Sequence, residues 1–310
     1  MQMLQCICAI DRNNILGEGA YSVVCAGTYK TSQVAIKTFK KVTGKDCSEL
    51  FKAIKKEAAL GAQLRHPNII HFWGQSVDPS TGDPVLVLDR LGKSVYDAIR
   101  QDLPPSVAIR SKWLLDTAHA LDYLHSQDPP IIHRDLKPDN ILLDITSQKA
   151  VLADFGLSSS LSLTLSLHTT YSKDKIPTTG HIFFTPPEAT AIGYKASTKY
   201  DVFSFGMAMY FILTRHWPFE GEEMIGKLWI VERWITIGSR PDRYGKKDYA
   251  RPVDVVADAS WDLIERCWNQ DADQRPSFCT TIITNLEILA MKDYVPKKLG
   301  IAKNPNDGSK

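Results

Sequence analysis

The stretch Ile131–Asn140 reads I-I-H-R-D-L-K-P-D-N and gathers several reactive side chains in one short run. It holds a carboxylate at Asp135, an amine at Lys137 and an amide at Asn140. A proline directly after the lysine favours a surface loop, and one loop can present these three groups to a single point. The simpler interpretation is a solvated charge cluster before a proline turn, which the three letters H-R-D alone would favour.

The run from His133 to Asn140 as a whole resembles the catalytic loop of eukaryotic protein kinases. In that family the aspartate orients the attacking hydroxyl group and accepts its proton, a role that the resemblance gives to Asp135. It also implies that Lys137 steadies the transferring phosphoryl group and that Asn140 holds a magnesium ion. These residue types suit phosphoryl transfer because that reaction depends mostly on positioning and charge neutralisation.

Length and composition fit one unit of two lobes. The chain has 310 residues, 44% hydrophobic and 23% charged, so its core needs no disulfide support. A formal net charge of +2 gives no electrostatic case for binding nucleic acid or a membrane surface. The six cysteines show neither metal-site spacing nor a secreted framework, and the first residues form neither a signal core nor a membrane-spanning segment. We therefore expect a soluble, cytoplasmic protein.

Two motifs before the catalytic loop match the smaller lobe of a kinase. Gly17, Gly19 and Ser22 stand where the family's glycine-rich loop has its three glycines, so this hairpin is expected to close over nucleotide phosphates. Taken alone, that motif could equally be an ordinary glycine turn. Lys37 ends V-A-I-K in a strand predicted over 32–39, and the resemblance implies that it pairs with the α and β phosphates. A lysine on a buried strand otherwise costs stability, which favours this role over a snorkelling edge lysine.

A helix is predicted over 49–64, because its apolar residues recur at helical spacing and no proline interrupts it. Glu57 is the only acid late enough in this helix to reach Lys37, and the family has an ion pair at this place. The alternative is a solvated glutamate on the outer face of the helix. We expect Glu57 to pair with Lys37 and to belong to the catalytic set.

Gly61 departs from the family pattern. Four residues after the pairing glutamate, kinases usually have an apolar side chain that stacks on the phenylalanine of the D-F-G motif, here Phe155. Phe72 and His133 would supply the other members of this stacked column. A missing side chain should weaken the active arrangement of the helix, which indicates regulated activity assisted by a regulatory partner or a dimer.

A strand predicted over 84–88 leads into the hinge between the lobes. The resemblance makes Leu88 the gatekeeper and gives the backbone of the hinge the task of holding adenine, between apolar residues above and below the purine. Each of those apolar residues could equally be plain core. The residues expected at the adenine are Val24, Ala35, Leu88, Asp89, Leu91 and Leu142.

A short apolar hairpin, predicted over 141–143 and 150–152, leads from the catalytic loop to a D-F-G motif that begins at Asp154. The resemblance implies that Asp154 chelates the magnesium that bridges the phosphates. The hairpin folds the chain back on itself, so we expect Asp154 to lie beside Asn140 as a second metal ligand.

The segment 158–180 is rich in Ser, Thr and Leu and stands in the place of the kinase activation segment. Arg134 precedes the catalytic aspartate directly, an arrangement that in this family couples activity to a phosphate in that segment. The simpler interpretation is a flexible polar loop. We expect phosphorylation within the set Thr169, Thr170, Ser172, Thr178 and Thr179.

The run G-H-I-F-F-T-P-P-E ends at Glu188 and departs from the usual kinase pattern twice. His181 replaces a threonine that in Ser/Thr kinases bonds the catalytic Asp and Lys, and Pro186 replaces the alanine of A-P-E. The second departure resembles receptor-interacting kinases of the tyrosine-kinase-like group. Lys137 nevertheless follows the Ser/Thr pattern, and we expect Ser/Thr specificity.

Two supporting contacts are expected in the larger lobe. Asp201 begins D-V-F-S-F-G, which resembles the family's D-V-W-S-F-G, and should brace the backbone of the catalytic loop. Arg275 resembles the arginine that pairs with the glutamate of the P-E element, here Glu188. Both roles are structural.

The expected fold class is α+β, a bilobal protein kinase fold with a small antiparallel-sheet lobe carrying one helix and a larger, mainly helical lobe. The small lobe and hinge should span 1–91 and the large lobe 92–291, with a disordered tail over 292–310.

The resemblance implies an enzyme that uses ATP and Mg²⁺ to phosphorylate Ser/Thr hydroxyl groups of protein substrates in intracellular signalling. The alternative is a catalytically weak scaffold or interaction module of the same fold. That alternative is favoured by the departures at Ser22, Gly61 and His181, whereas every residue that carries the chemistry is present.

Overall fold

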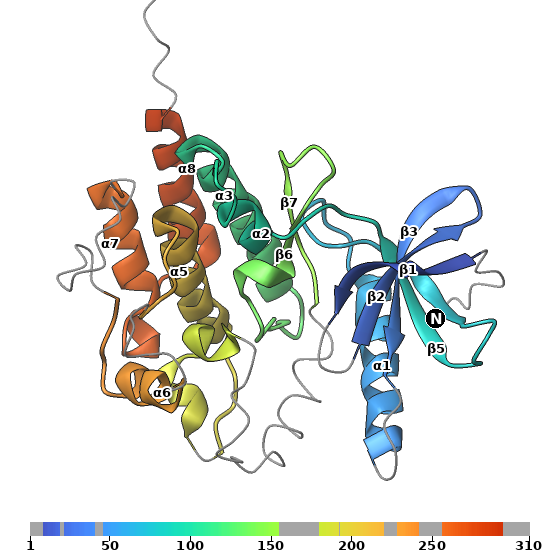
Figure 1. Ribbon diagram of the computed structural model, residues 1–310. Helices are drawn as coiled ribbons and strands as arrows, with labels where there is room; N and C mark the ends of the chain where they lie inside the picture. The colour runs from blue at the N-terminus through green and yellow to red at the C-terminus, as the bar shows by residue number, and fades with distance from the viewer. Residues whose placement is uncertain are drawn as a thin grey trace, which may run out of the picture.

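The computed structural model describes residues 9–18, 22–40, 46–154, 180–191, 193–219, 228–241 and 256–293. Figure 1 shows two lobes, a sheet with one long helix beside it and a larger bundle of helices. The predicted α+β architecture is confirmed. Within the described part, no helix has both the length and the apolar character needed to cross a membrane.

The smaller lobe is one antiparallel sheet with the strand order β1-β2-β3-β5-β4. The helix α1 (Asp46–Gln63) packs against β4, so the α1 prediction over 49–64 is confirmed to within a few residues at each end. The five strands are β1 (Ala9–Glu18), β2 (Ser22–Tyr29), β3 (Ser32–Phe39), β4 (Phe72–Val77) and β5 (Pro84–Asp89).

One glycine decides how closely the first strands can pack. A Cβ atom at Gly27 would lie 2.2 Å from Cδ1 of Ile36 and 2.7 Å from the carbonyl oxygen of Ala9. Residue 27 therefore has to be glycine for β1 and β3 to flank β2 as they do. The uninterrupted pairing of β2 with β3 then places Val24 opposite Lys37.

The larger lobe is helical, with one two-stranded hairpin at its edge nearest the sheet lobe (Figure 1). The hairpin pairs β6 (Ile141–Leu143) with β7 (Ala150–Leu152), as predicted. The helices of this lobe are α2 (Val95–Ile99), α3 (Val107–His125), α5 (Thr198–Thr214), α6 (Leu228–Thr236), α7 (Asp258–Cys267) and α8 (Ile283–Asp293). The final helical stretch opens with one π-helical segment at Phe278–Ile282, which leads into α8.

Helix starts follow serine caps. The Ser94 hydroxyl accepts a hydrogen bond from the Asp97 backbone N–H at 3.0 Å, and the Asp97 carboxylate reaches back to the Ser94 N–H at 3.3 Å. Ser106 caps α3 and Ser197 caps α5 in the same sense. Such caps satisfy backbone donors that have no partner within the helix.

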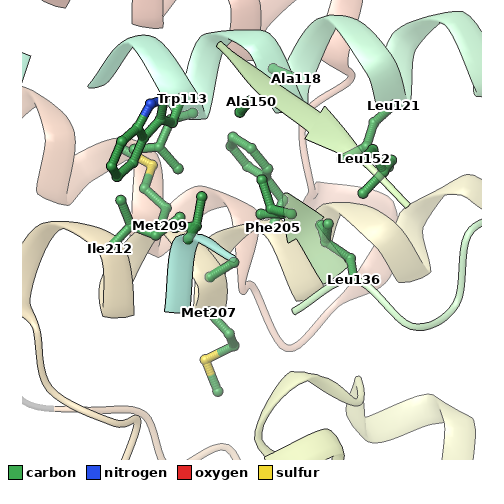
Figure 2. Close-up of a cluster of buried hydrophobic side chains, with 14 of the residues drawn as sticks. Trp113, Ala118, Leu121, Leu136, Ala150, Leu152, Phe205, Met207, Met209 and Ile212 are labelled. Atoms are coloured by element: carbon green, nitrogen blue, oxygen red, sulfur yellow. The ribbon is translucent and has the colours of Figure 1, made fainter. Parts of the chain in front are cut away.

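Helix α5 runs through the centre of the larger lobe, and nearly all its residues are buried. Figure 2 shows its Phe205 and Met209 among side chains from α3, β7 and the catalytic loop. Arg110 of α3 is 1% exposed and donates to the carbonyl oxygens of Ile212 and Leu213 at 3.1 and 2.9 Å, which satisfies the end of α5.

Leu136 connects this core to the candidate site. It is the only leucine between His133 and Asn140, it is 1% exposed, and it points into the cluster in Figure 2. Burying one leucine stabilises the fold by about 1.5–3 kcal/mol. Leu136 thus anchors the catalytic loop in the core.

Candidate active site

The catalytic loop brings its three predicted polar residues together. The Asp135 carboxylate accepts hydrogen bonds from the Lys137 Nζ at 3.2 Å and from the Asn140 Nδ2 at 2.9 Å. Asn140 also donates to the Asp135 carbonyl oxygen at 2.8 Å, because the 3₁₀ turn η1 (Pro138–Asn140) folds it back. The amide thereby fixes both the backbone and the side chain of Asp135.

A fully buried aspartate of α5 holds the backbone of the catalytic loop. Asp201 of α5 accepts hydrogen bonds from the backbone N–H groups of His133 and Arg134, both at 2.9 Å, as predicted. Arg134 has a φ of 66°, a left-handed conformation that costs a non-glycine residue about 1–3 kcal/mol. The two bonds to one carboxylate stabilise that conformation. His125 adds a third, from Nε2 at 2.7 Å, which the sequence analysis did not foresee.

His133 connects the catalytic loop to the strand that leads to Asp154. Its Nε2–H donates to the carbonyl oxygen of Ala153 at 3.0 Å, and its Nδ1 accepts from the Asp135 N–H at 3.2 Å. These partners define the neutral tautomer with the proton on Nε2. A further bond runs from the Ala153 N–H to the Asn140 carbonyl oxygen at 2.9 Å. Asp135 and Asp154 are therefore held on neighbouring segments, as the hairpin predicted.

Lys37 stands between two carboxylates. Its Nζ lies 3.1 Å from Oε1 of Glu57 and also forms an ion pair with Asp154, while the Lys37 side chain is only 3% exposed. Burial alone would lower the pKa of Lys37, but the charges of Asp154 and Glu57 outweigh it, and the pKa is raised. Lys37 is therefore a permanent cation at the centre of the site.

The two carboxylates respond differently to this position. The Lys37 charge lowers the pKa of Asp154, whose side chain is half exposed. Burial raises the pKa of Glu57 against the opposing effect of Lys37. Asp154 is the anion that remains accessible to a ligand, and Glu57 is the one that holds Lys37 from inside the lobe.

The pairing of the strands brings together several residues that were expected at the nucleotide. Ala35 lies opposite Leu88, and Gly17 lies opposite Val24. A β-bridge links Ser94 to Leu142 and so brings β6 to the segment after the hinge. Backbone bonds reinforce this junction, from Gly92 N–H to the Leu143 carbonyl oxygen at 2.7 Å and from Leu143 N–H to that of Lys93 at 2.9 Å.

The hinge residue Asp89 is fixed on two sides. Its N–H donates to the carbonyl oxygen of His71 at 3.0 Å, and its carboxylate accepts from Nε1 of Trp73 at 2.7 Å. Leu88, directly before it, packs with Phe72 and Leu86 in the cluster beneath α1. The predicted gatekeeper therefore lies between the hinge and the helix that carries Glu57.

The predicted pair of Glu188 and Arg275 is present and bidentate. Nη1 and Nη2 of Arg275 donate to the two carboxylate oxygens at 2.6 and 2.8 Å, and Arg275 is 1% exposed. Its guanidinium group also lies over the ring of Phe203, 5.0 Å from the centroid. Arg240, which follows α6, lies 5.1 Å from the centroid of the same ring. Burial, together with the charge of Arg275, lowers the pKa of Arg240 to about 10.

Some predicted features fall outside the described residues. They are Gly19 of the glycine-rich loop, Phe155, the side chain of His181, and the segment 158–179 with its expected phosphorylation sites. Ser22 is described and begins β2. The roles given to these residues stay predictions.

Gly61 does not leave the gap that the sequence suggested. Its Cα faces Phe72, and a Cβ atom there would lie 3.1 Å from both Cβ and Cγ of that phenylalanine. The Phe72 side chain is 6% exposed and fills the space. The Lys37–Glu57 pair is formed despite the glycine.

Comparison with known proteins agrees with this geometry. Residues 10–286 match the model of the family described as "Protein kinase domain". The chain is 32% identical over 298 residues to a probable serine/threonine-protein kinase, drkD, of Dictyostelium discoideum, covering 93% of this chain and 20% of that protein. It is 30% identical over 273 residues to human mitogen-activated protein kinase kinase kinase 7, covering 86% of this chain and 40% of that protein.

A third relative is a putative serine/threonine-protein kinase/receptor, R818, of Acanthamoeba polyphaga mimivirus, 33% identical over 264 residues, which cover 84% of this chain and 14% of that protein. The chain thus spans less than half the length of each of these relatives. The family match extends from β1 to α8 and contains both the catalytic loop and the Lys37 cluster. On this evidence the chain belongs to the protein kinase domain family.

Proposed function

We propose that this domain is an ATP-dependent Ser/Thr protein kinase. The observation that carries the proposal is that Asp135, Lys137 and Asn140 meet in one hydrogen-bonded loop, held next to the Lys37–Glu57–Asp154 cluster. Phosphoryl transfer needs a positioned hydroxyl group and fixed positive charge around the phosphate, and these two groups of residues supply them. The names of the relatives support Ser/Thr specificity.

Asp135 acts on the protein substrate. Its carboxylate accepts hydrogen bonds from Lys137 and Asn140, and a substrate hydroxyl group beside it would donate a further one. That bond aims the hydroxyl oxygen at the γ-phosphorus, and the proton passes to the carboxylate as the new P–O bond forms and the bond to ADP breaks. Lys137, 3.2 Å from Asp135, neutralises charge on the transferring phosphoryl group.

Lys37 acts on the nucleotide. As a permanent cation between two carboxylates, it can donate to the α and β phosphates while Glu57 keeps its side chain in place. Gly17, Gly19, Ser22 and Val24 belong to the strands and loop that would cover the phosphates. Ala35, Leu142 and the segment from Leu88 to Leu91 would hold the adenine, as the family's pattern implies.

The donor set fits magnesium. Asp154 offers a half-exposed carboxylate, and the Asn140 amide leaves its oxygen available because its nitrogen bonds Asp135. Mg²⁺ is commonly held by one or two such oxygen ligands together with phosphate oxygens, so no larger cage is required. Within the described residues no cluster of three His, Cys, Asp or Glu side chains could hold a metal by itself. When bound, the ion neutralises phosphate charge.

The finer expectations belong to the same proposal. We assign residues 1–91 to the small lobe with its hinge, 92–291 to the large lobe and 292–310 to a tail, within a cytoplasmic signalling protein of the tyrosine-kinase-like group. A phosphate in the segment 158–180 would bind Arg134, and a regulatory partner or a second copy would act on α1. The supporting observations are the placement of Arg134 beside Asp135 and the similarity to a mitogen-activated protein kinase kinase kinase.

A transfer assay with γ-labelled ATP and a generic protein substrate tests the function. We expect incorporation into Ser and Thr for the wild type and loss to background for Asp135→Asn, with Asp262→Asn on the exposed face of α7 as the matched control. Equal background incorporation in wild type and Asp135→Asn would instead support a non-enzymatic scaffold. Incorporation into tyrosine alone would refute the Ser/Thr assignment.

A further inference from the structure

Gly61 lies so close to Phe72 that a side chain at residue 61 would not fit without a shift. Gly61 is buried on α1, one turn beyond Glu57, and faces the first residue of β4. A Cβ atom at residue 61 would meet Cβ and Cγ of Phe72 at 3.1 Å and Cδ2 at 3.4 Å. The helix backbone therefore rests directly on the phenylalanine, and even an alanine would require a shift.

The phenylalanine occupies a place that a side chain of α1 would otherwise fill. Phe72 packs in one buried cluster with Ile54 and Ala58 of α1 and Leu86 of β5. With Phe72 itself 6% exposed and Ile54, Ala58 and Leu86 each at 1% or less, this cluster is closed to solvent. The missing side chain at Gly61 and the large ring at Phe72 thus form one complementary pair.

The same face of α1 carries the glutamate of the site. Glu57 and Gly61 are four residues apart, so they lie one above the other on the helix. Glu57 reaches Lys37 on β3 at 3.1 Å, while Gly61 touches Phe72 on β4. Besides the packing of Ile54 and Ala58, the helix therefore meets the sheet through an ion pair at Glu57 and a contact of backbone with a ring at Gly61.

We propose that Gly61 and Phe72 are paired positioning residues, which set the distance between α1 and the sheet and thereby place Glu57 against Lys37. The Phe72 ring supplies from the sheet the bulk that residue 61 lacks. This arrangement holds the ion pair through contacts within the chain. The expected effect of this contact on kcat rests on the proposed kinase function, whereas its effect on the position of α1 does not.

The test moves side-chain volume from residue 72 to residue 61. Gly61→Leu should force α1 away from the sheet and lower kcat by about 10- to 100-fold, since displacing a catalytic group by about 1 Å has effects of that size. Phe72→Ala removes the ring and should also lower kcat. The double variant Gly61→Leu with Phe72→Ala roughly conserves volume and should recover kcat to within about threefold of wild type. Ala59→Leu adds the same side chain at an exposed position of α1 and should leave kcat unchanged.

A second background separates positioning from general damage to the fold. In Glu57→Gln protein the ion pair is already absent, so Gly61→Leu should lower the residual kcat by less than about twofold. Equal losses in both backgrounds would overturn the proposal, as would a double variant no better than Gly61→Leu. If Phe72→Ala does not fold, Phe72→Leu replaces it, with Gly61→Ala as its partner.

Thermal unfolding distinguishes failure of this inference from failure of the proposed function. The double variant should have a higher Tm than either single variant, whether or not the protein transfers phosphate. A wild type no more active than Asp135→Asn, together with this recovery of Tm, refutes the kinase function and retains the contact. An active wild type without recovery of Tm in the double variant refutes the contact and retains the kinase.

Discussion

The two halves of the active site are held in different ways. The catalytic loop belongs to the larger lobe, where Leu136 is buried in the core and Asp201 binds two successive backbone N–H groups. The Lys37 cluster is assembled from three separate elements, β3, α1 and the segment after β7. Burial of Leu136 and hydrogen bonds to Asp201 thus fix the conformation of the catalytic loop, whereas the geometry of the Lys37 cluster depends on the position of α1. Substitutions in the two halves should therefore differ in how they divide between stability and activity.

The largest effect on stability is expected at the ion pair of Glu188 and Arg275 in the larger lobe. Glu188→Ala leaves Arg275 as an uncompensated charge at 1% exposure, and breaking a buried pair from one side costs about 3–5 kcal/mol. Chemical denaturation monitored by tryptophan fluorescence should show this loss in the free energy of unfolding. Asp262→Asn, at an exposed site, is the control, and a loss below about 1 kcal/mol would show that Arg275 finds other partners.

A smaller loss of stability and a clear loss of activity are expected for the loop brace. Asp201→Asn replaces one acceptor oxygen by an amide that faces donor groups, so at least one of three hydrogen bonds is lost. The free energy of unfolding should fall by about 1–3 kcal/mol, and kcat should fall with it. Unchanged kcat in a folded Asp201→Asn protein would contradict the idea that this carboxylate holds the loop conformation.

A substitution in the Lys37 cluster should instead lower activity much more than stability. Glu57→Gln keeps a hydrogen-bonding side chain at the same place and leaves Lys37 paired with Asp154, so the loss of stability should be about 1 kcal/mol or less. Lys37 loses its orientation, and kcat should fall about 10- to 100-fold. Tm and steady-state kinetics on one preparation measure both. Parallel losses of stability and activity would remove the contrast between the two halves.

The smallest effect concerns acid stability of the sheet lobe. Asp78, after β4, is partly desolvated, but hydrogen bonds from Ser80 and the ion pair with Arg12 outweigh burial and lower its pKa to about 2. Because the folded pKa lies below the unfolded value near 4, the carboxylate stabilises the fold at neutral pH and loses this effect as pH falls toward 2. Asp78→Asn should therefore cost about 1–2 kcal/mol at pH 7.

The control for that prediction is the same pair of proteins at low pH. Wild type and Asp78→Asn should approach one another in free energy of unfolding near pH 2, because the wild-type carboxyl group is then about half protonated in the folded state and almost fully protonated in the unfolded state. A difference that stays constant from pH 7 to pH 2 would mean that Asp78 contributes through packing and hydrogen bonding by its neutral form.

Much of the fold was predictable because its signals are local. The strand at 32–39, the hairpin after Asn140 and the helix α1 follow from local patterns, and their bounds differ from prediction by a few residues at most. The supporting pairs at Asp201 and at Glu188 with Arg275 followed from resemblance to the family and are present.

Other features could not be read from the chain. His125 joins Asp201 across 76 residues of sequence, and Arg240, which follows α6, reaches the ring of Phe203 on α5. Arg110, which no sequence motif marks, closes the end of α5. Contacts of this kind depend on which elements become neighbours, and periodicity carries no information about that.

The sequence by itself determined the family and suggested the reactive residues, because all eight residues of His133–Asn140 match the catalytic loop of that family and Asp135, Lys137 and Asn140 stand among them. Tertiary structure alone decided the meaning of Gly61. As a letter, this glycine signalled a missing side chain and a weakened helix. In the fold, Phe72 of β4 fills the space, because its side chain can approach the helix backbone this closely only where residue 61 has no Cβ atom.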